Sequence, residues 1–195
     1  VAAYLPNIPE TVVAFLACAS IGAVWCSCAT EFGPRSVIDR FAQIEPRVLL
    51  AVDGYRYGGT DFDRLGVVQE LVAALPAVEH VVVLGYLDPE PPLDGLRGAI
   101  RWPELRAAGE GAMLAFEQLP ADHPLWVLYS SGTTGLPKAI VHGHGGILLE
   151  TLKTMNLHVD LQADDRLFWF TTTGWMMWNF VLGGLTTDAS IVLYD

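Results

Sequence analysis

The residues best suited to chemistry form one run of ten, between an apolar segment that ends at Leu128 and another that starts at Ala139. The run holds four Ser and Thr residues, two glycines and a lysine, and it reads Tyr129-Ser130-Ser131-Gly132-Thr133-Thr134-Gly135-Leu136-Pro137-Lys138. Glycine lets a backbone approach a ligand closely, hydroxyl and backbone N–H groups donate to anionic oxygens, and an ammonium adds positive charge. This composition is typical of a loop that wraps a phosphate chain.

Three familiar loop signatures do not fit this run. A Walker loop needs Ser or Thr directly after its lysine, and Lys138 is followed by alanine. The dinucleotide-binding form needs a third glycine, which the segment 143–145 lacks. A serine-hydrolase elbow needs a glycine two residues before the serine, and neither Ser130 nor Ser131 has one.

The flanking segments predict the elements that hold the loop. Residues 126–129 and 139–142 are short apolar runs rich in branched and aromatic side chains, which indicates two strands. From Gly145 to Met155 apolar residues recur at helical spacing, which predicts a helix. The predicted order is therefore strand, loop, strand, helix.

The run resembles the phosphate-binding signature of the adenylate-forming superfamily, which includes acyl-CoA synthetases, peptide-synthetase adenylation domains and luciferases. That signature is an aromatic residue, Ser/Thr-Ser-Gly-Thr-Thr-Gly, a variable residue and Pro-Lys, and every position is filled here. The resemblance implies that the loop binds the phosphates of ATP through Ser130, Ser131, Gly132, Thr133, Thr134, Gly135 and Lys138. It implies catalytic roles for Lys138, Thr133 and Thr134 while the substrate carboxylate attacks the α-phosphorus. From the residues alone, a polar turn and a solvated lysine are the alternatives.

A second constellation carries two tryptophans and two methionines after a glycine. It follows a predicted strand over 167–170 and reads Thr171-Thr172-Thr173-Gly174-Trp175-Met176-Met177-Trp178-Asn179. Periodicity alone favours the core of a helix. The acetyl-CoA synthetase branch, however, places a Gly-Trp segment in its acyl pocket, and this run and Ala139 are similar to acetoacetate-activating members. The resemblance thus implies that Trp175, Met176 and Met177 contact the acyl group.

Arg56 and two histidines are weaker candidates. By resemblance, a Gly-x-Arg element ending at Arg56 contacts the 3′-phosphate of CoA, although the second arginine often found three positions later is Gly59 here. A solvated turn arginine is the alternative. His142 and His144 share one face of a strand, and support of the phosphate loop is expected of them. Because no third ligand has a fitting spacing, no metal site is predicted.

Composition narrows the class of partner and the compartment. Net charge is −11, with 11 basic against 22 acidic residues, which argues against nucleic-acid binding. The three cysteines form no metal-ligand set and indicate buried thiols in a reducing compartment, so a cytoplasmic location is expected. The uncharged stretch 11–29 is rich in Ala, Ser and Cys and is divided by Gly22. It predicts a helix over 9–21 and a strand over 23–28 rather than a membrane span.

Alternation of elements predicts the fold. Strands are expected at 48–52 and 81–84, a helix after Gly33-Pro34 that ends before Pro46, and another within 62–75. This pattern indicates an α/β fold with mainly parallel sheets. Residues 88–111 contain many prolines and glycines and predict a surface excursion with one short helix after Trp102.

The expected organisation is one truncated domain in three portions. The portions are an α/β part over 1–87, a Pro/Gly-rich excursion over 88–120 and an α/β part with the phosphate loop over 121–195. The chain begins and ends inside strand-like segments, and by resemblance it is expected to be cut from the large N-terminal AMP-binding domain of an adenylate-forming enzyme.

The resemblance implies an ATP-dependent acid–CoA ligase that forms an acyl adenylate and passes the acyl group to CoA. Acetoacetate is the expected acid; acetate, propionate or another short acid is the alternative. ATP, Mg2+ and CoA are implied, with the Mg2+ ligand outside this chain, because the family's later Gly-x-Thr-Glu segment is absent. The isolated chain is expected to be inactive. Expected partners are these small molecules and the remainder of the parent chain, without nucleic acid or membrane.

Overall fold

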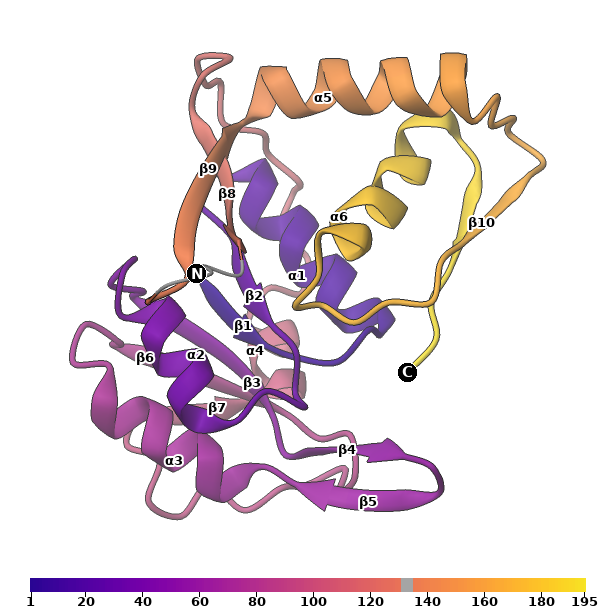
Figure 1. Cartoon of the computed structure of the whole chain (residues 1–195). Helices are drawn as coiled ribbons and strands as arrows, with labels where there is room; N and C mark the ends of the chain where they lie inside the picture. The colour runs from indigo at the N-terminus through magenta and orange to yellow at the C-terminus, as the bar shows by residue number, and fades with distance from the viewer. Residues whose placement is uncertain (131–134) are drawn as a thin grey trace.

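A five-stranded, fully parallel sheet forms the centre of the first half of the chain in this computed structural model, which describes residues 1–130 and 135–195 (Figure 1). The strand order is β2-β1-β3-β6-β7. The strands are β1 (Ala2–Tyr4), β2 (Cys26–Cys28), β3 (Val48–Val52), β6 (His80–Leu84) and β7 (Ala99–Arg101). The predicted α/β fold with a mainly parallel sheet is confirmed.

Apolar side chains on both faces explain why these segments lie inside the molecule. Successive residues of a strand point to opposite faces, so β3 contributes Leu50 and Val52 to one core and Leu49 and Ala51 to the other. All four are buried. Strands buried on both faces are expected to be apolar throughout, as in parallel sheets.

Helices cover both faces of the sheet. Helix α1 (Pro9–Ser20) packs in the first core, whereas α2 (Pro34–Phe41) and α3 (Leu65–Ala74) pack in the second. Both α1 and α2 have proline in the first turn, where its missing N–H costs no helical hydrogen bond. Within the described residues no helix combines the length and the apolar character that crossing a membrane requires.

The second half of the chain is a hairpin followed by helices and a small sheet. The hairpin joins β8 (Pro124–Ser130) to β9 (Lys138–Gly143) in antiparallel pairing. Helix α5 (His144–Lys153) continues into a π-helical turn, η1 (Thr154–His158), and β10 (Arg166–Phe168) pairs in parallel with β11 (Ser190–Val192). Between these two strands lie α6 (Met176–Leu182) and the 3-10 helix η2 (Gly183–Thr187).

An aromatic cluster joins the two halves. The ring centroid of Phe15 on α1 lies 5.9 Å from Trp25, 5.6 Å from Trp126 on β8 and 6.1 Å from Trp178 on α6. The indole N–H of Trp178 donates to the Asn7 side chain over 3.0 Å. The backbone of Trp25 also pairs with β8 on both sides of Trp126. The hairpin and α6 are therefore fixed to the parallel sheet.

Two pairings were not predicted. β7 lies inside the Pro/Gly-rich segment, where only the short helix, observed as α4 (Trp102–Ala108), was expected. As a three-residue edge strand held by backbone bonds to β6, it has little sequence pattern to reveal it. β4 (Gly54–Tyr57) and β5 (Thr60–Asp63) form a hairpin around Arg56. Its turn, Gly58-Gly59, has φ values of 58° and 80°, as two-residue hairpin loops require.

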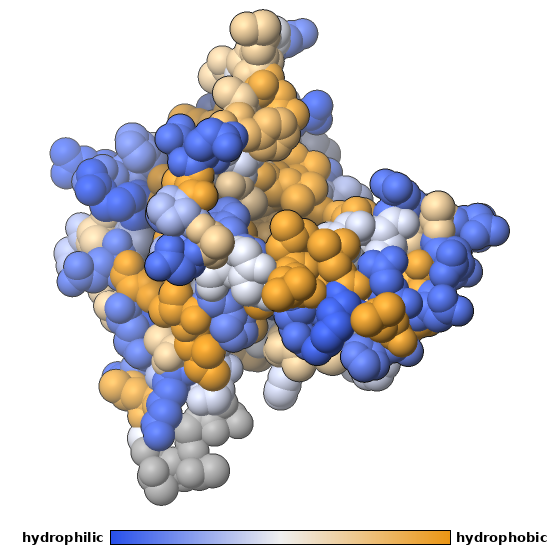
Figure 2. All heavy atoms as spheres, turned by 90° about the horizontal axis from the view of Figure 1, so that it is seen from above, coloured by the Kyte–Doolittle hydropathy of each residue, from blue (hydrophilic) through white to orange (hydrophobic). Residues whose placement is uncertain are grey.

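Apolar side chains gather on the face that carries α5, which Figure 2 shows from above. Leu148, Leu149 and Leu152 of α5 are all exposed. Helix α5 exposes an apolar stripe instead of a polar one.

Candidate functional site

The two strands of the β8–β9 hairpin bring Ser130 and Lys138 together at the ends of the run 129–138, which is called the phosphate-type loop below. Ser130 pairs with Lys138 in the strand register, and Lys138 is exposed. Among the described residues no carboxylate forms an ion pair with Lys138. Its ammonium charge is therefore available to an anion at the loop.

The middle of the phosphate-type loop lies outside the described residues. The phosphate-binding and catalytic roles expected there therefore stay predictions from the sequence; they concern Ser131, Gly132, Thr133 and Thr134. Gly135, on the described side, has φ 110°, a conformation that side-chain-bearing residues rarely adopt. The loop thus uses a glycine where its backbone requires one.

Helix α2 and the residues just after it hold both stems of the loop. The Tyr129 hydroxyl, on the β8 stem, donates to the backbone carbonyl of Arg40 over 2.5 Å. Burial raises the pKa of Tyr129, so the hydroxyl stays protonated and remains a donor. On the β9 stem, the Gln43 side chain donates from Nε2 to the Pro137 carbonyl over 2.9 Å.

The Arg40 guanidinium lies between two aromatic rings. Its Cζ is 5.1 Å from the ring centroid of Phe32 and 5.9 Å from that of Tyr129. One terminal nitrogen, Nη1, donates to the carbonyl and the hydroxyl of Ser36, over 2.7 and 2.6 Å. These contacts hold the side chain in one orientation beside the loop.

The run 171–179, called the acyl-type segment below, is held by hydrogen bonds at its start and has exposed side chains further on. Thr173 donates its hydroxyl to the Leu5 carbonyl over 2.6 Å, and Ser27 donates to the Thr173 carbonyl over 2.8 Å. Beyond Gly174, Trp175 and Met176 are 61% and 60% exposed. Both are thus free to contact a ligand.

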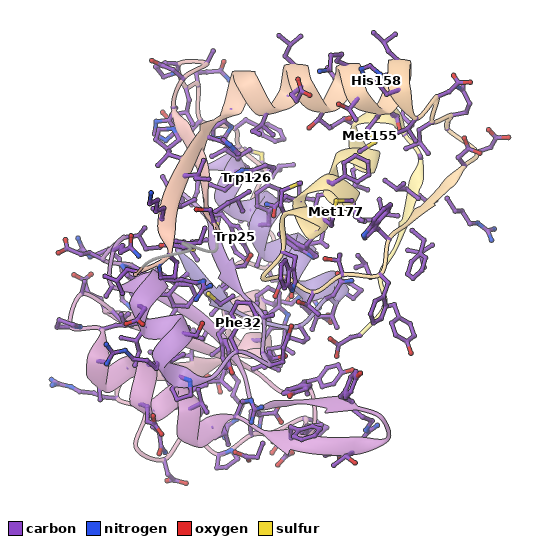
Figure 3. The ribbon with its side chains drawn as sticks, viewed as in Figure 1. Trp25, Phe32, Trp126, Met155, His158 and Met177 are labelled. Atoms are coloured by element: carbon purple, nitrogen blue, oxygen red, sulfur yellow. The ribbon has the colours of Figure 1, made fainter. Side chains whose placement is uncertain are left out.

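The next two residues turn towards the interior. Met177, labelled in Figure 3, is half-buried, and Trp178 is fully buried in the aromatic cluster. The segment therefore combines a surface part with a helix core, so both interpretations of its sequence apply, each to different residues.

Arg56 lies apart from the phosphate-type loop. In Figure 1 the β4–β5 hairpin lies at the bottom of the molecule, whereas the β8–β9 hairpin lies in its upper part. The Arg56 guanidinium donates to both carboxylate oxygens of Asp61, over 2.5 and 3.1 Å, and this bond lowers the pKa of Asp61. Arg56 is exposed, on a strand rather than a turn.

The paired histidines have structural contacts. His142 accepts a hydrogen bond at Nδ1 from the indole N–H of Trp126 over 2.9 Å. Burial, and then the neighbouring His123, lower the pKa of His144, which keeps this ring neutral. In residues 1–130 and 135–195 no group of three or more His, Cys, Asp or Glu is placed to hold a metal ion.

Phe32, Arg40 and Gln43 are the site residues that sequence reasoning missed. Tyr129 and Arg40 are 89 positions apart, and Gln43 and Pro137 are 94 apart. Contacts of this separation leave no local pattern, so the sequence offers no signal for them.

The chain belongs to the AMP-binding enzyme family, whose pattern matches residues 1–195. It is 43% identical over 200 residues to acetoacetyl-CoA synthetase of Mus musculus and 44% identical over 196 residues to acetoacetyl-coenzyme A synthetase of Rhizobium meliloti (strain 1021). Each match covers 100% of this chain and 30% of the relative. A solved structure, acetoacetyl-CoA synthetase from Streptomyces lividans, superposes with TM-score 0.94 at 57% identity, covering 100% of this chain and 29% of that one. The chain thus spans about 30% of the length of these relatives.

Proposed function

We propose that this chain is part of an ATP-dependent acid–CoA ligase that activates acetoacetate. The supporting observation is the β8–β9 hairpin, in which Lys138 pairs with Ser130 at the ends of the two strands that flank a glycine- and hydroxyl-rich loop. No carboxylate of the described residues forms an ion pair with this lysine. The similarity to acetoacetyl-CoA synthetases adds the choice of acid.

The proposed reaction has two steps. A carboxylate oxygen of acetoacetate attacks the α-phosphorus of ATP, the bond to the β-phosphate oxygen breaks, and acyl-AMP and pyrophosphate form. The thiol sulfur of CoA then attacks the acyl carbon, the bond from that carbon to the AMP phosphate oxygen breaks, and the thiol proton passes to solvent, which gives the thioester and AMP. This chain's contribution is positioning and charge neutralisation, and its side chains form no covalent intermediate.

Each predicted site residue has a role in this proposal. Lys138 follows the charge that develops on the leaving pyrophosphate, and the rest of the loop donates hydrogen bonds to the phosphate oxygens. The phosphate-binding residues are Ser130, Ser131, Gly132, Thr133, Thr134 and Gly135. Trp175, Met176 and Met177 contact the acyl group. Arg56 contacts CoA, for which it must exchange its bond to Asp61 for one to a phosphate.

The proposal extends to the cofactor, the parent polypeptide and the compartment. We further propose that the ligase uses Mg2+ and that the ligands of this ion lie in the remainder of a longer protein; among the described residues no group of three or more His, Cys, Asp or Glu is placed to hold a metal ion. Three free, buried thiols support a reducing, cytoplasmic location.

Pyrophosphate exchange tests the proposal. The complete ligase that contains this sequence should exchange labelled pyrophosphate into ATP in the presence of acetoacetate, and more slowly with acetate or propionate. Lys138→Ala should lower the exchange rate by roughly 100-fold without changing the unfolding temperature, since it removes charge only where charge develops. Equal rates with all three acids would exclude the acetoacetate assignment. An undiminished rate in the folded Lys138→Ala enzyme would exclude the role of that lysine.

The 195-residue chain alone should form no acyl adenylate.

A further inference from the structure

A continuous stack of side chains connects the acyl-type segment to the phosphate-type loop. Phe32, labelled in Figure 3, is the first member. A Cβ built on Gly174 would lie 2.8 Å from Phe32 Cζ, so this ring lies directly against the backbone that precedes Trp175. Phe32 also contacts Arg40, whose guanidinium carbon lies 5.1 Å from the Phe32 ring centroid.

The stack then reaches the loop through Tyr129. The Arg40 guanidinium lies 5.9 Å from the Tyr129 ring centroid, and the Tyr129 hydroxyl donates to the Arg40 carbonyl. Tyr129 directly precedes Ser130, the last described residue on the β8 stem. A shift of Arg40 would therefore move the stem from which the loop starts.

Gln43 completes the connection on the opposite stem. Its Nε2 donates both to the Asp39 carbonyl, over 2.7 Å, and to the Pro137 carbonyl, over 2.9 Å. Pro137 directly precedes Lys138. The end of α2 thus contacts the stem on each side of the loop, and the Arg40 side chain cannot turn away easily because Ser36 holds Nη1.

We propose that Phe32, Arg40 and Gln43 are positioning residues that couple the acyl-binding segment to the ATP phosphate loop. This inference rests on the function proposed above. Phe32 transmits the position of the Gly174 backbone to Arg40, and Arg40 and Gln43 set the position of Ser130 and Lys138. Coupling through packed side chains requires an energetic test, because spatial contact alone does not demonstrate it.

Kinetics of the complete ligase test the stem contacts. Tyr129→Phe removes the hydroxyl and with it the bond to the Arg40 carbonyl. Gln43→Leu removes the amide and with it the bonds to the Asp39 and Pro137 carbonyls, of which only the second reaches a stem of the loop. Each should raise KM for ATP by about five- to tenfold, the loss that one hydrogen bond gives, and leave KM for acetoacetate unchanged. Arg35→Met on the same helix is the matched control, because Arg35 is 86% exposed and pairs with Asp39 rather than with the stack. It should change neither constant.

A double-substitution cycle tests the coupling itself. Phe32→Leu and Arg40→Met should each raise KM for ATP. Arg40→Lys, which keeps the positive charge, should raise KM for ATP much less than Arg40→Met. The Phe32→Leu/Arg40→Met double variant should lose less than the product of the two single losses, since both act along one connection. Phe32→Leu should also raise KM for acetoacetate.

The outcomes separate this inference from the proposed function. An unsubstituted ligase without acid-dependent pyrophosphate exchange would overturn the proposed function. In an active ligase, stem variants that behave like Arg35→Met, or losses that multiply in the double variant, would overturn the positioning role alone. Unfolding temperatures measured on every variant identify losses due to misfolding, and the hydroxyl-only change in Tyr129→Phe keeps the test available if a larger substitution unfolds the enzyme.

Discussion

Gly174 shows how one missing side chain joins packing to the candidate site. Its backbone lies against Phe32 and Ala29, where an added Cβ would be 2.8 Å from Phe32 Cζ and 3.1 Å from the Ala29 Cβ. Real Cβ contacts are essentially never as short as 2.8 Å, so any other residue would push the Phe32 ring or the backbone away. A glycine at position 174 therefore lets the backbone just before Trp175 lie directly against the Phe32 ring.

Gly174→Ala should destabilise the 195-residue chain by about 1–3 kcal/mol, because the methyl group overpacks this contact. Urea unfolding followed by tryptophan fluorescence measures the change. Gly146→Ala is the control, because Gly146 lies within α5 and its added Cβ meets nothing within 4 Å. That substitution should be stabilising by up to about 1 kcal/mol, as alanine favours helices. Equal effects of the two substitutions would contradict the contact at Gly174.

Asn179 has a buried side-chain amide that makes no hydrogen bond to the described residues. It is 6% exposed, and among the described residues neither its Nδ2 nor its Oδ1 has a hydrogen-bond partner. It lines a cavity of about 590 Å³ between α1, α5 and α6, together with apolar residues such as Phe15 and Leu182. An unpaired buried amide costs free energy, typically about 1–3 kcal/mol.

Asn179→Leu should therefore keep or raise the free energy of unfolding of the 195-residue chain, by up to about 2 kcal/mol. Leucine has a similar volume and no polar atom to leave unpaired. Urea titration of both proteins checks this, with Asn156→Leu on the exposed surface of η1 as the control. A clear loss of stability on Asn179→Leu alone would mean that the amide is paired in solution.

At the scale of elements, the sequence predicted what local patterns can encode. β3 has its predicted bounds, Val48–Val52, because an uninterrupted branched apolar run follows Pro46. α1 begins at Pro9, as predicted, and ends one residue before the predicted Ile21. β7 was not predicted because it is a three-residue edge strand with little pattern of its own. The Gly58-Gly59 turn of the β4–β5 hairpin, by contrast, was a signal that could have been used.

The candidate site divides in the same way. The hairpin stems around Lys138 follow from two short strands and a recognisable motif. The contacts of α2 with Tyr129 and Pro137 do not, because they depend on how the hairpin docks beside the sheet.

The end of β3 also holds a neighbouring connection in place. The buried carboxylate of Asp53 accepts backbone N–H bonds from Tyr86, Leu87 and Asp88, at 2.7–3.1 Å. These residues follow β6, so one side chain closes the gap between adjacent strand ends. Charged acceptors give the stronger hydrogen bonds in proteins.

Asp53→Ala should lower the free energy of unfolding by about 2–4 kcal/mol, because three N–H groups lose a charged acceptor. Asp53→Asn should cost less, since one oxygen still accepts. Urea titration measures both, and Asp94→Asn on an exposed turn, which should leave stability unchanged, is the control. A similar small effect for all three would show that the residues after β6 hold their conformation without Asp53.

For the whole molecule, three buried thiols, one on α1 and two on β2, make stability respond to alkali. Cys18, Cys26 and Cys28 are free and buried. Burial raises the pKa of Cys18 from 9.0 to about 11 and that of Cys26 to about 12, and it raises the pKa of Cys28 well above 9.0. Above pH 9 the unfolded chain therefore releases thiol protons that the folded chain retains.

The free energy of unfolding should consequently fall as the pH rises through 9, because the unfolded state then binds fewer protons than the folded state. Three thiols together should remove roughly 3 kcal/mol between pH 8.5 and 10. Tyr4, whose pKa burial raises to about 12, adds to the loss only above pH 10. Urea titrations at half-unit pH steps, under reducing conditions, measure the slope. The Cys18→Ala/Cys26→Ala/Cys28→Ala variant should show most of this slope removed, and Cys28→Ala alone about a third. A flat profile for the unsubstituted chain would mean that the thiols meet solvent in the folded state, which is incompatible with their burial in the two cores of the parallel sheet.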